Sequence, residues 1–231
     1  KQWRAAIDPL LYRTTLGGHG HGISMFARVQ PSTRTFLSFG PSYNRSLDKL
    51  QYVRAVADPT AAAFGGSRYI LSDVDQHQLA FDTRFNVTFT PWMTLELWAQ
   101  PFFASGHYAN FKEFDAPRQA GVSVYGRDRG TLTANIDSTG HTTGYTVDPD
   151  ASGPAVPFSL ANPDFTLRSL RGSAVFRWEY RPGSTLFLVW TQQRSDQGPE
   201  GDFNFSRERH ALAGTRPNNV FMIKATWWLA R

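Results

Sequence analysis

Hydrophobic and polar residues alternate with a period of two along much of the chain. Between residues 79 and 89, one side carries Leu, Phe, Val and Thr, whereas the other carries mainly polar and charged residues. The same alternation occurs in 168–181 and near the C-terminus, where Phe221 and Ile223 oppose Lys224. Because successive side chains of a strand point to opposite faces, this pattern predicts strands with one apolar and one charged face.

The alternation predicts about ten antiparallel strands. They run near 2–7, 21–30, 33–45, 49–57, 67–75, 78–89, 93–104, 167–181, 184–195 and 218–230. The links after 30, 57, 89 and 181 then lie at one end of the sheet, and those after 7, 45, 75, 104 and 195 lie at the other. The alternation is poor in 49–57 and 67–75.

A soluble antiparallel sandwich alternates in the same way, but three further features favour a membrane protein. Many predicted strands are close to the roughly 9–11 residues of a membrane strand, against about 5–6 in globular proteins. Turns at one end are tight, whereas 105–166 and 196–217 are long and polar. The residues closest to the short turns include several aromatic ones, as in the girdle of a membrane barrel: Trp92, Trp178, Tyr180, Trp227 and Trp228.

The sequence therefore predicts an all-β fold, namely an antiparallel transmembrane β-barrel or the C-terminal part of a larger one. Residues 1–231 form a single domain in this prediction, and 105–166 is a long extracellular loop region. Its many Gly, Pro and charged residues cannot lie against lipid, because their backbone groups would stay unpaired there. Short strands at about 121–126 and 131–137 are expected to extend the wall above the membrane.

The two faces of the strands divide the candidate functional residues into two sets. The residues expected to line the lumen are Asp82, Arg84, Asn86, Glu96, Arg171, Arg177, Glu179 and Lys224. The residues expected to face lipid are Phe81, Phe85, Phe89, Phe176, Trp178, Phe221, Ile223 and Trp227. The inward charges either pair with one another in a plugged barrel or line a conducting pore, and the sequence leaves both open.

Composition excludes several classes of protein. Hydrophobic residues make up 41% and charged residues 19% of the 231 residues, so the chain is not a disordered polyelectrolyte. Its mean hydropathy of −0.39 and the lack of any apolar run of about 18 residues exclude a bundle of membrane helices. The chain has no Cys, so it has no disulfide, thiolate metal ligand or cysteine nucleophile. It opens at Lys1 without an apolar leader, and any signal peptide is expected to lie upstream.

The net charge of +5 suits an anionic partner such as lipid or lipopolysaccharide. The basic residues are scattered, and no nucleic-acid-binding motif is present, so no nucleic acid partner is expected. The motifs of serine hydrolases, zinc proteases and phosphate-binding loops are also absent, so the protein is expected not to be an enzyme.

Two short segments contain residues of the types that bind metals. His19 and His21 lie in a Gly-rich stretch, but no third ligand is near in sequence, and a plain loop explains them as well. Asp148 and Asp150 begin a segment that is similar to the first half of a calcium loop, with Gly153 at the sixth position. The twelfth position is Ser159 rather than Glu, so the alternatives are an acidic turn and a surface calcium site. Calcium at Asp148 and Asp150 is the one cofactor that the sequence suggests.

Four stretches resemble a known family. They are LSFGPSYNRSLDKLQYV (37–53), FDTRFNVTFTPWMTLELWAQPFFASGHYANFKEF (81–114), SLRGSAVFRWEYRPGSTLFLVWTQQRSD (169–196) and NNVFMIKATWWLAR (218–231). The chain resembles the C-terminal, outer-membrane-barrel-like domain of unknown function of bacterial proteins that often carry a family-9-like carbohydrate-binding module. The resemblance implies an outer-membrane barrel without a known activity. Members of the family are much longer, so we expect the module and several earlier strands to lie outside this sequence. The final residue, Arg231, also departs from the terminal aromatic residue of many barrels.

Together these features predict a bacterial outer-membrane β-barrel that acts as a channel, anchor or envelope scaffold. Outer-membrane lipid and lipopolysaccharide are the expected partners, and glycan binding or uptake is expected if a carbohydrate-binding module accompanies the barrel. The alternative is a soluble β-rich carbohydrate-binding or carbohydrate-active domain.

Overall fold

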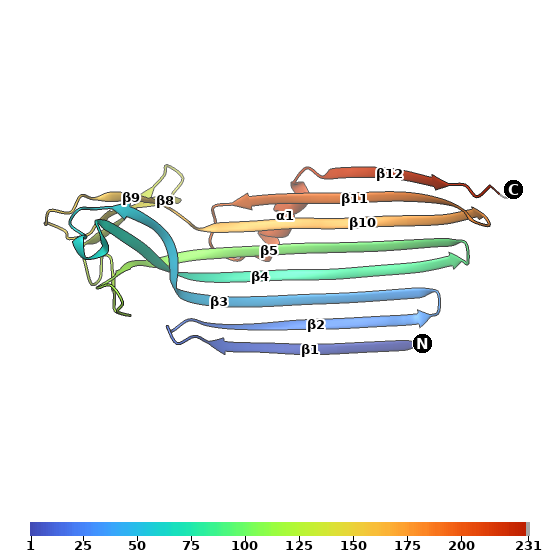
Figure 1. Ribbon diagram of the computed structural model, residues 1–231, viewed down its shortest axis with the longest axis horizontal. Helices are drawn as coiled ribbons and strands as arrows, with labels where there is room; N and C mark the ends of the chain where they lie inside the picture. Colours follow the sequence, from blue (N-terminus) through green and yellow to red (C-terminus); the bar gives the residue numbers. More distant parts are fainter. Residues whose placement is uncertain (230–231) are drawn as a thin grey trace.

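The computed structural model describes residues 1–229 and consists mainly of antiparallel strands (Figure 1). Eight long strands form one antiparallel sheet, and each strand pairs with the long strand before it and the long strand after it in the chain. In spatial order they are β1 (Gln2–Arg13), β2 (His19–Ser32), β3 (Thr35–Ala57), β4 (Ser67–Thr90), β5 (Met93–Phe114), β10 (Phe165–Arg181), β11 (Ser184–Gly198) and β12 (Asn218–Thr226). The predicted all-β class and antiparallel arrangement are confirmed.

Two pairs of predicted strands are single strands in the structure. The segments 33–45 and 49–57 both belong to β3, and 67–75 and 78–89 both belong to β4. The expected links after 45 and 75 were therefore wrong, and the 58–66 link lies at the end with the long connections. In β4 the reason is that residues 70–74 are buried on both faces, and in β3 it is one extra residue after Asp48 and another after Tyr52, which shift its register against β4. A β-bulge of this kind resets the side-chain alternation without ending the strand.

The main sheet is open. β1 and β12 form its two edges, and neither pairs with a further strand within residues 1–229. Every residue of β12 and nearly every residue of β1 is exposed. Closure into a barrel therefore stays a prediction. The start of β1 and the end of β12 both lie at the end of the sheet that carries the short turns (Figure 1).

The connection from β5 to β10 is a folded insertion rather than a loop. β5 continues to Phe114, so the connection covers 115–164 instead of the predicted 105–166. It contains β6 (Val122–Val124) and β7 (Thr131–Ile136), which match the two predicted short strands, as well as β8 (Thr142–Asp148) and β9 (Phe158–Ala161). β6 pairs with β5, whereas β7, β8 and β9 form a separate sheet. We call this insertion, with the 58–66 link and its short 3-10 helix η1 (Ala62–Phe64), the cap.

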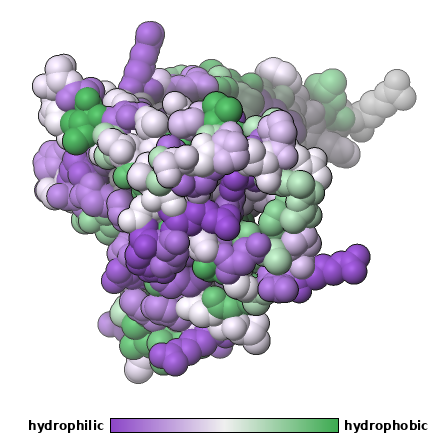
Figure 2. Space-filling view, turned by 90° about the vertical axis from the view of Figure 1, so that its left-hand side faces the viewer, coloured by the Kyte–Doolittle hydropathy of each residue, from purple (hydrophilic) through white to green (hydrophobic). Residues whose placement is uncertain are grey.

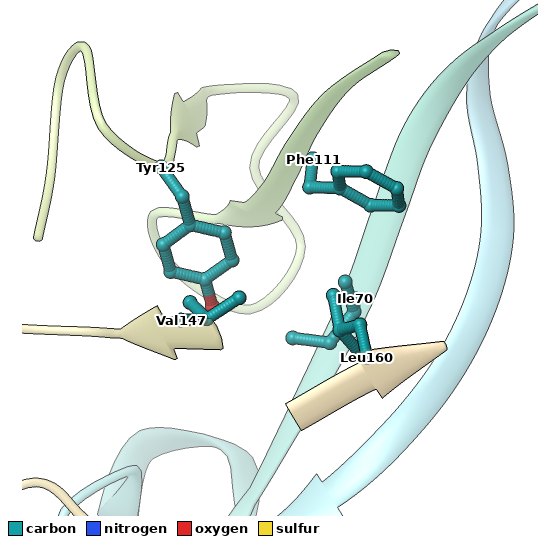
Figure 3. Packing of buried hydrophobic residues seen from close by; sticks show 5 residues of the cluster. All are labelled: Ile70, Phe111, Tyr125, Val147 and Leu160. Carbon is teal, nitrogen blue, oxygen red and sulfur yellow. The ribbon is translucent and has the colours of Figure 1, made fainter. Parts of the chain in front are cut away.

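The main hydrophobic core lies between the cap and the adjoining ends of β4 and β5. Ile70 of β4 and Phe111 of β5 pack against Tyr125, Val147 and Leu160 of the insertion (Figure 3). All five side chains are at most 2% exposed. Figure 2 looks onto this end of the molecule, where hydrophilic residues cover most of the surface. The cap is therefore packed like a small water-soluble domain, in contrast to the two broad faces of the main sheet.

The 196–217 segment, predicted as a loop, contains helix α1 (Phe205–Gly214). Asn204 caps its N-terminus by accepting a hydrogen bond from the backbone N–H of Arg207 at 3.0 Å. This Asn-x-x-Arg-Glu start is a helix signal that the strand pattern around it obscured. No helix in the described chain is both long enough and apolar enough to span a membrane.

Candidate membrane-facing surface and polar face

One face of the main sheet carries an apolar row that crosses all eight strands. Each residue of the row is the direct partner of the next, in the order Trp3, Val29, Leu37, Phe85, Leu97, Ala174, Trp190 and Phe221. Directly paired residues of antiparallel strands point to the same side. We call this side the apolar face and the opposite side the polar face.

The register places the predicted lipid-facing residues of the strands together on the apolar face. Phe81 and Phe89 lie an even number of residues from Phe85 on β4, so their side chains point to the same side. The strand register also places two residues of β10 and two of β12 on this side: Phe176, Trp178, Phe221 and Ile223. Phe221 and Ile223 are 75% and 76% exposed. Trp227 follows the end of β12 and is also exposed. These side chains form a continuous hydrophobic surface toward the end with the short turns.

All eight residues predicted to line a lumen lie on the polar face. Asn86 pairs with Glu96, and Arg177 pairs with Phe187, which in turn pairs with Lys224. The other four residues lie an even number of positions from these on the same strands, so they also point to the polar face: Asp82, Arg84, Arg171 and Glu179. The structure thus brings together the complete set that alternation had assigned to one side.

Ion pairs on the polar face join residues of the same strand only, within residues 1–229. Arg84 pairs with Asp82 at 3.4 Å, and Arg177 pairs with Glu179 at 2.9 Å. Trp98 Nε1 also donates a hydrogen bond to Asp82 at 3.0 Å. In the part of the chain that the structure describes, Glu96, Arg171 and Lys224 form no ion pair, so these three charges need water.

Helix α1 lies across the apolar face, where the hydrophobic surface gives way to polar residues. Phe205 at its start contacts Phe81 and Phe103, with ring centroids 6.4 and 5.3 Å apart. Farther along the helix, Glu208 forms a buried ion pair with Arg168 of β10. At its end, Arg194 of β11 donates a hydrogen bond to the carbonyl oxygen of Ala213 at 2.9 Å. The helix therefore lies across β10 and β11, behind the sheet in Figure 1, and the Phe205 side chain at its start reaches β5 and β4.

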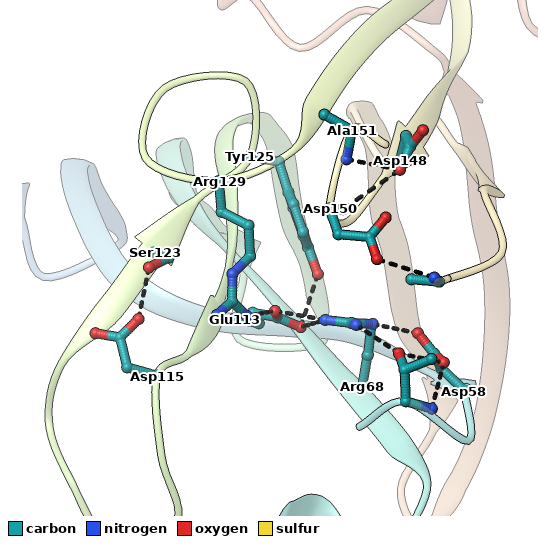
Figure 4. A network of polar contacts seen from close by, with 12 residues as sticks. Asp58, Arg68, Glu113, Asp115, Ser123, Tyr125, Arg129, Asp148, Asp150 and Ala151 are labelled. Carbon is teal, nitrogen blue, oxygen red and sulfur yellow. Dashed lines mark hydrogen bonds and ion pairs between the residues drawn. The ribbon is translucent and has the colours of Figure 1, made fainter. Parts of the chain in front are cut away.

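A buried network of charges ties the cap to the main sheet (Figure 4). Arg68 of β4 donates hydrogen bonds to Asp58 at 2.5 Å and to both oxygens of Glu113 at 2.7 and 2.9 Å. The Tyr125 hydroxyl donates to Glu113 at 2.9 Å, and Arg129 also pairs with Glu113. The alternation gave no sign of this network, because its members come from four separate segments.

The network shifts the acidity of two groups in the cap. Burial by itself would raise the pKa of Asp58, but hydrogen bonds from Arg68 and Thr60 outweigh burial and hold this pKa below its ordinary value. Burial raises the pKa of the Tyr125 hydroxyl, and the nearby Glu113 carboxylate raises it further. The folded cap therefore favours an ionised Asp58 and a neutral Tyr125.

The two aspartates predicted to bind calcium hold a turn of the cap. Asp148 Oδ1 accepts hydrogen bonds from the backbone N–H groups of Asp150 at 3.3 Å and Ala151 at 3.0 Å (Figure 4). Asp150 Oδ2 accepts one from Ala155 at 2.9 Å. No group of three or more His, Asp or Glu side chains in the described chain converges in a way that suits a metal ion. The geometry is that of the acidic turn, and calcium binding there stays a prediction.

The histidine pair lies at the start of β2 instead of in a loop. His19 and His21 are exposed and share a shallow hollow with Arg45 and Asp75. Asp75 is held by the Arg45 guanidinium at 2.6 and 2.9 Å. The carboxylate nearest to the histidines is therefore already paired with a cation.

No protein-family model matches the chain, and no curated protein or solved structure matches it either.

Proposed function

We propose that the main sheet is part of the wall of a β-barrel in the bacterial outer membrane, with its apolar face toward lipid. The observation that carries this proposal is the apolar row, which crosses all eight strands. Within residues 1–229, helix α1 and the residues just before it, such as Phe203 on His77, cover part of this face toward the cap. A soluble monomer rarely exposes so large an apolar surface. In a membrane, lipid covers such a face, and the strands satisfy each other's backbone hydrogen bonds.

The polar face would line the lumen of this barrel. Glu96, Arg171 and Lys224 form no ion pair with the described residues, and the two ion pairs on this face do not connect strands. Charges of this kind are stable where water reaches them. This arrangement supports a water-filled, conducting lumen over one plugged by a network of paired charges. Anchor and envelope scaffold remain the other roles of such a wall.

The two edge strands set a condition on closure. β1 runs from the end with the short turns toward the cap, and β12 runs in the opposite direction. Direct pairing of β12 with β1 is therefore antiparallel, and so is closure through any even number of further strands. The resemblance to longer barrel proteins that carry a carbohydrate-binding module supports closure through further strands and a role in glycan binding or uptake.

Site-directed spin labels test the orientation of the sheet in the complete protein. A label at Phe85 and a label at its neighbour Arg84 point to opposite faces. We expect the label at 85 to be quenched by a lipid-soluble reagent and the label at 84 by a water-soluble one. The competing function, a soluble carbohydrate-binding domain, requires a second layer over the apolar face. Recovery of the protein in the soluble fraction without detergent, with both labels inaccessible to the lipid-soluble reagent, would refute the membrane wall.

A further inference from the structure

A groove lies in the apolar face directly beside α1. It has a volume of about 340 Å³, and its lining is almost entirely apolar. The groove exists because small residues of neighbouring strands meet between larger ones. Ala99, Gly172 and Ala174 form its floor, and Phe85, Leu97 and Trp190 form its sides. We call it the acyl groove, because its shape and chemistry suit a hydrocarbon chain.

The end of the acyl groove nearest the cap is bordered by α1 and the residues that follow it. Gln192 lines the groove and donates a hydrogen bond to Asn219 at 3.1 Å, which places the 215–219 segment at the rim. Arg194 donates to Gln192 at 3.1 Å and to the carbonyl oxygen of Ala213 at 2.9 Å. The groove therefore runs from the middle of the hydrophobic surface to the helix.

The rim carries more positive than negative charge. Three acidic groups near α1 are paired with arginines, since Asp196 and Glu208 bind Arg168, and Asp202 binds Arg207, whereas Glu200 accepts a hydrogen bond from the Thr166 hydroxyl. Three arginines on or beside the helix form no ion pair with the described residues: Arg194, Arg209 and Arg216. Arg209 and Arg216 are exposed. Guanidinium groups at this position suit phosphate oxygens, which accept their N–H groups in pairs.

We propose that this surface binds one phosphate-bearing lipid of the outer leaflet, with an acyl chain in the acyl groove and its phosphate at Arg209 and Arg216. The proposal rests on the proposed membrane wall and adds a specific partner to it. The groove accounts for the chain, and the uncompensated arginines account for the headgroup. Continuity of the groove with the hydrophobic surface lets the lipid enter sideways from the bilayer.

Titration of diphosphoryl lipid A into the complete protein in a non-ionic detergent tests this site, with native mass spectrometry to count bound lipids. Replacing Arg209 and Arg216 by Gln should weaken binding about tenfold per arginine, as expected for loss of a charge-assisted hydrogen bond. Filling the groove with A99L and A174L should weaken it as well. The matched controls are R13Q and R54Q, which remove exposed arginines elsewhere, and A27L, which enlarges an alanine of the apolar face on β2.

The outcomes separate this site from the membrane wall. Equal binding by all variants would overturn the lipid site. Binding that depends on the arginines but not on the groove would also overturn it, because the ligand would then be a phosphate alone. Either of these two binding results, obtained with a protein whose label at 85 contacts lipid, would refute the lipid site but not the membrane wall. A soluble protein with a buried label at 85 would refute the wall itself.

Discussion

Phe205, the first residue of α1, packs edge-on against Phe103 of β5, with an interplanar angle of 88°. This contact lies where the hydrophobic surface of the sheet ends. Toward the short turns, the apolar face is uncovered; toward the cap, polar residues such as His77 and Asp75 replace the apolar ones on β4. In the membrane wall proposed above, a helix that lies across the strands at this boundary would lie parallel to the membrane surface, as an interfacial helix does.

The first prediction concerns neighbouring residues on opposite faces of β4. Phe85→Arg should impair folding into lipid by about 2–4 kcal/mol, because it places a cation on the lipid side near the midplane. Arg84→Gln should fold nearly normally, since its side chain points to the polar face. The measurement is the folded fraction in lipid vesicles against urea concentration. Equal losses for the two variants would contradict the assignment of the faces.

The second prediction concerns the attachment of α1 to the sheet. Glu208→Ala leaves the buried Arg168 guanidinium without one partner and should weaken the docking of α1 by roughly 3–5 kcal/mol. Amide hydrogen exchange in 205–214 measures this loss. Asp202→Ala, which removes an exposed partner of Arg207, serves as the control and should cost less than about 1 kcal/mol. Unchanged exchange in Glu208→Ala would show that the ion pair does not hold the helix.

The third prediction concerns acid and the cap. Asp58 has a lowered pKa in the folded protein, so its contribution to stability is complete above its unfolded pKa of about 3.9 and is lost as the pH falls through the lower folded value. The cap should therefore loosen below about pH 4. The measurement is the rate at which an acid-stable protease cleaves residues 115–164 at a series of pH values. Asp58→Asn should abolish this pH dependence at the cost of a weaker cap. The exposed Asp8→Asn should leave the acid profile of the wild type intact.

The fourth prediction concerns alkali. The raised pKa of Tyr125 means that the unfolded chain loses this proton near pH 10, whereas the folded cap keeps it. The stabilising effect is thus complete below about pH 10 and decreases as the pH rises toward the folded value. Tyr125→Phe should remove this alkaline loss, which thermal unfolding at several pH values measures. An identical alkaline decrease in Tyr125→Phe would assign the effect to another group.

The fifth prediction places the cap outside the cell. Trypsin added to intact bacteria should cut after Arg118, which is exposed in the cap and has a φ of 63°. Arg34, in the turn between β2 and β3, is also exposed but lies at the opposite end of the sheet. It should be cut only after the outer membrane is opened. Cleavage after Arg34 with Arg118 intact would invert the proposed topology.

Alternation alone determined most of the main sheet. It located the strands at 93–104, 167–181 and 184–195 to within a few residues at the ends near the short turns, and it placed the named strand residues on the correct faces. It failed in β3, where bulges reset the period and made one strand look like two, and in β4, where residues 70–74 are buried on both faces and do not alternate. The C-terminal strand expected at 218–230 ends at Thr226 in the structure, and residue 230 lies outside the described residues.

The sequence by itself therefore determined the all-β class and the composition of each face, because side-chain direction in a strand depends only on the local period of two. Only the tertiary structure decided which distant residues meet. Arg68 and Glu113 pair 45 positions apart, and Phe205 reaches Phe103 only because the chain folds back across the sheet. Such contacts depend on strand register and on the path of the connections, and a local pattern of polar and apolar residues encodes neither.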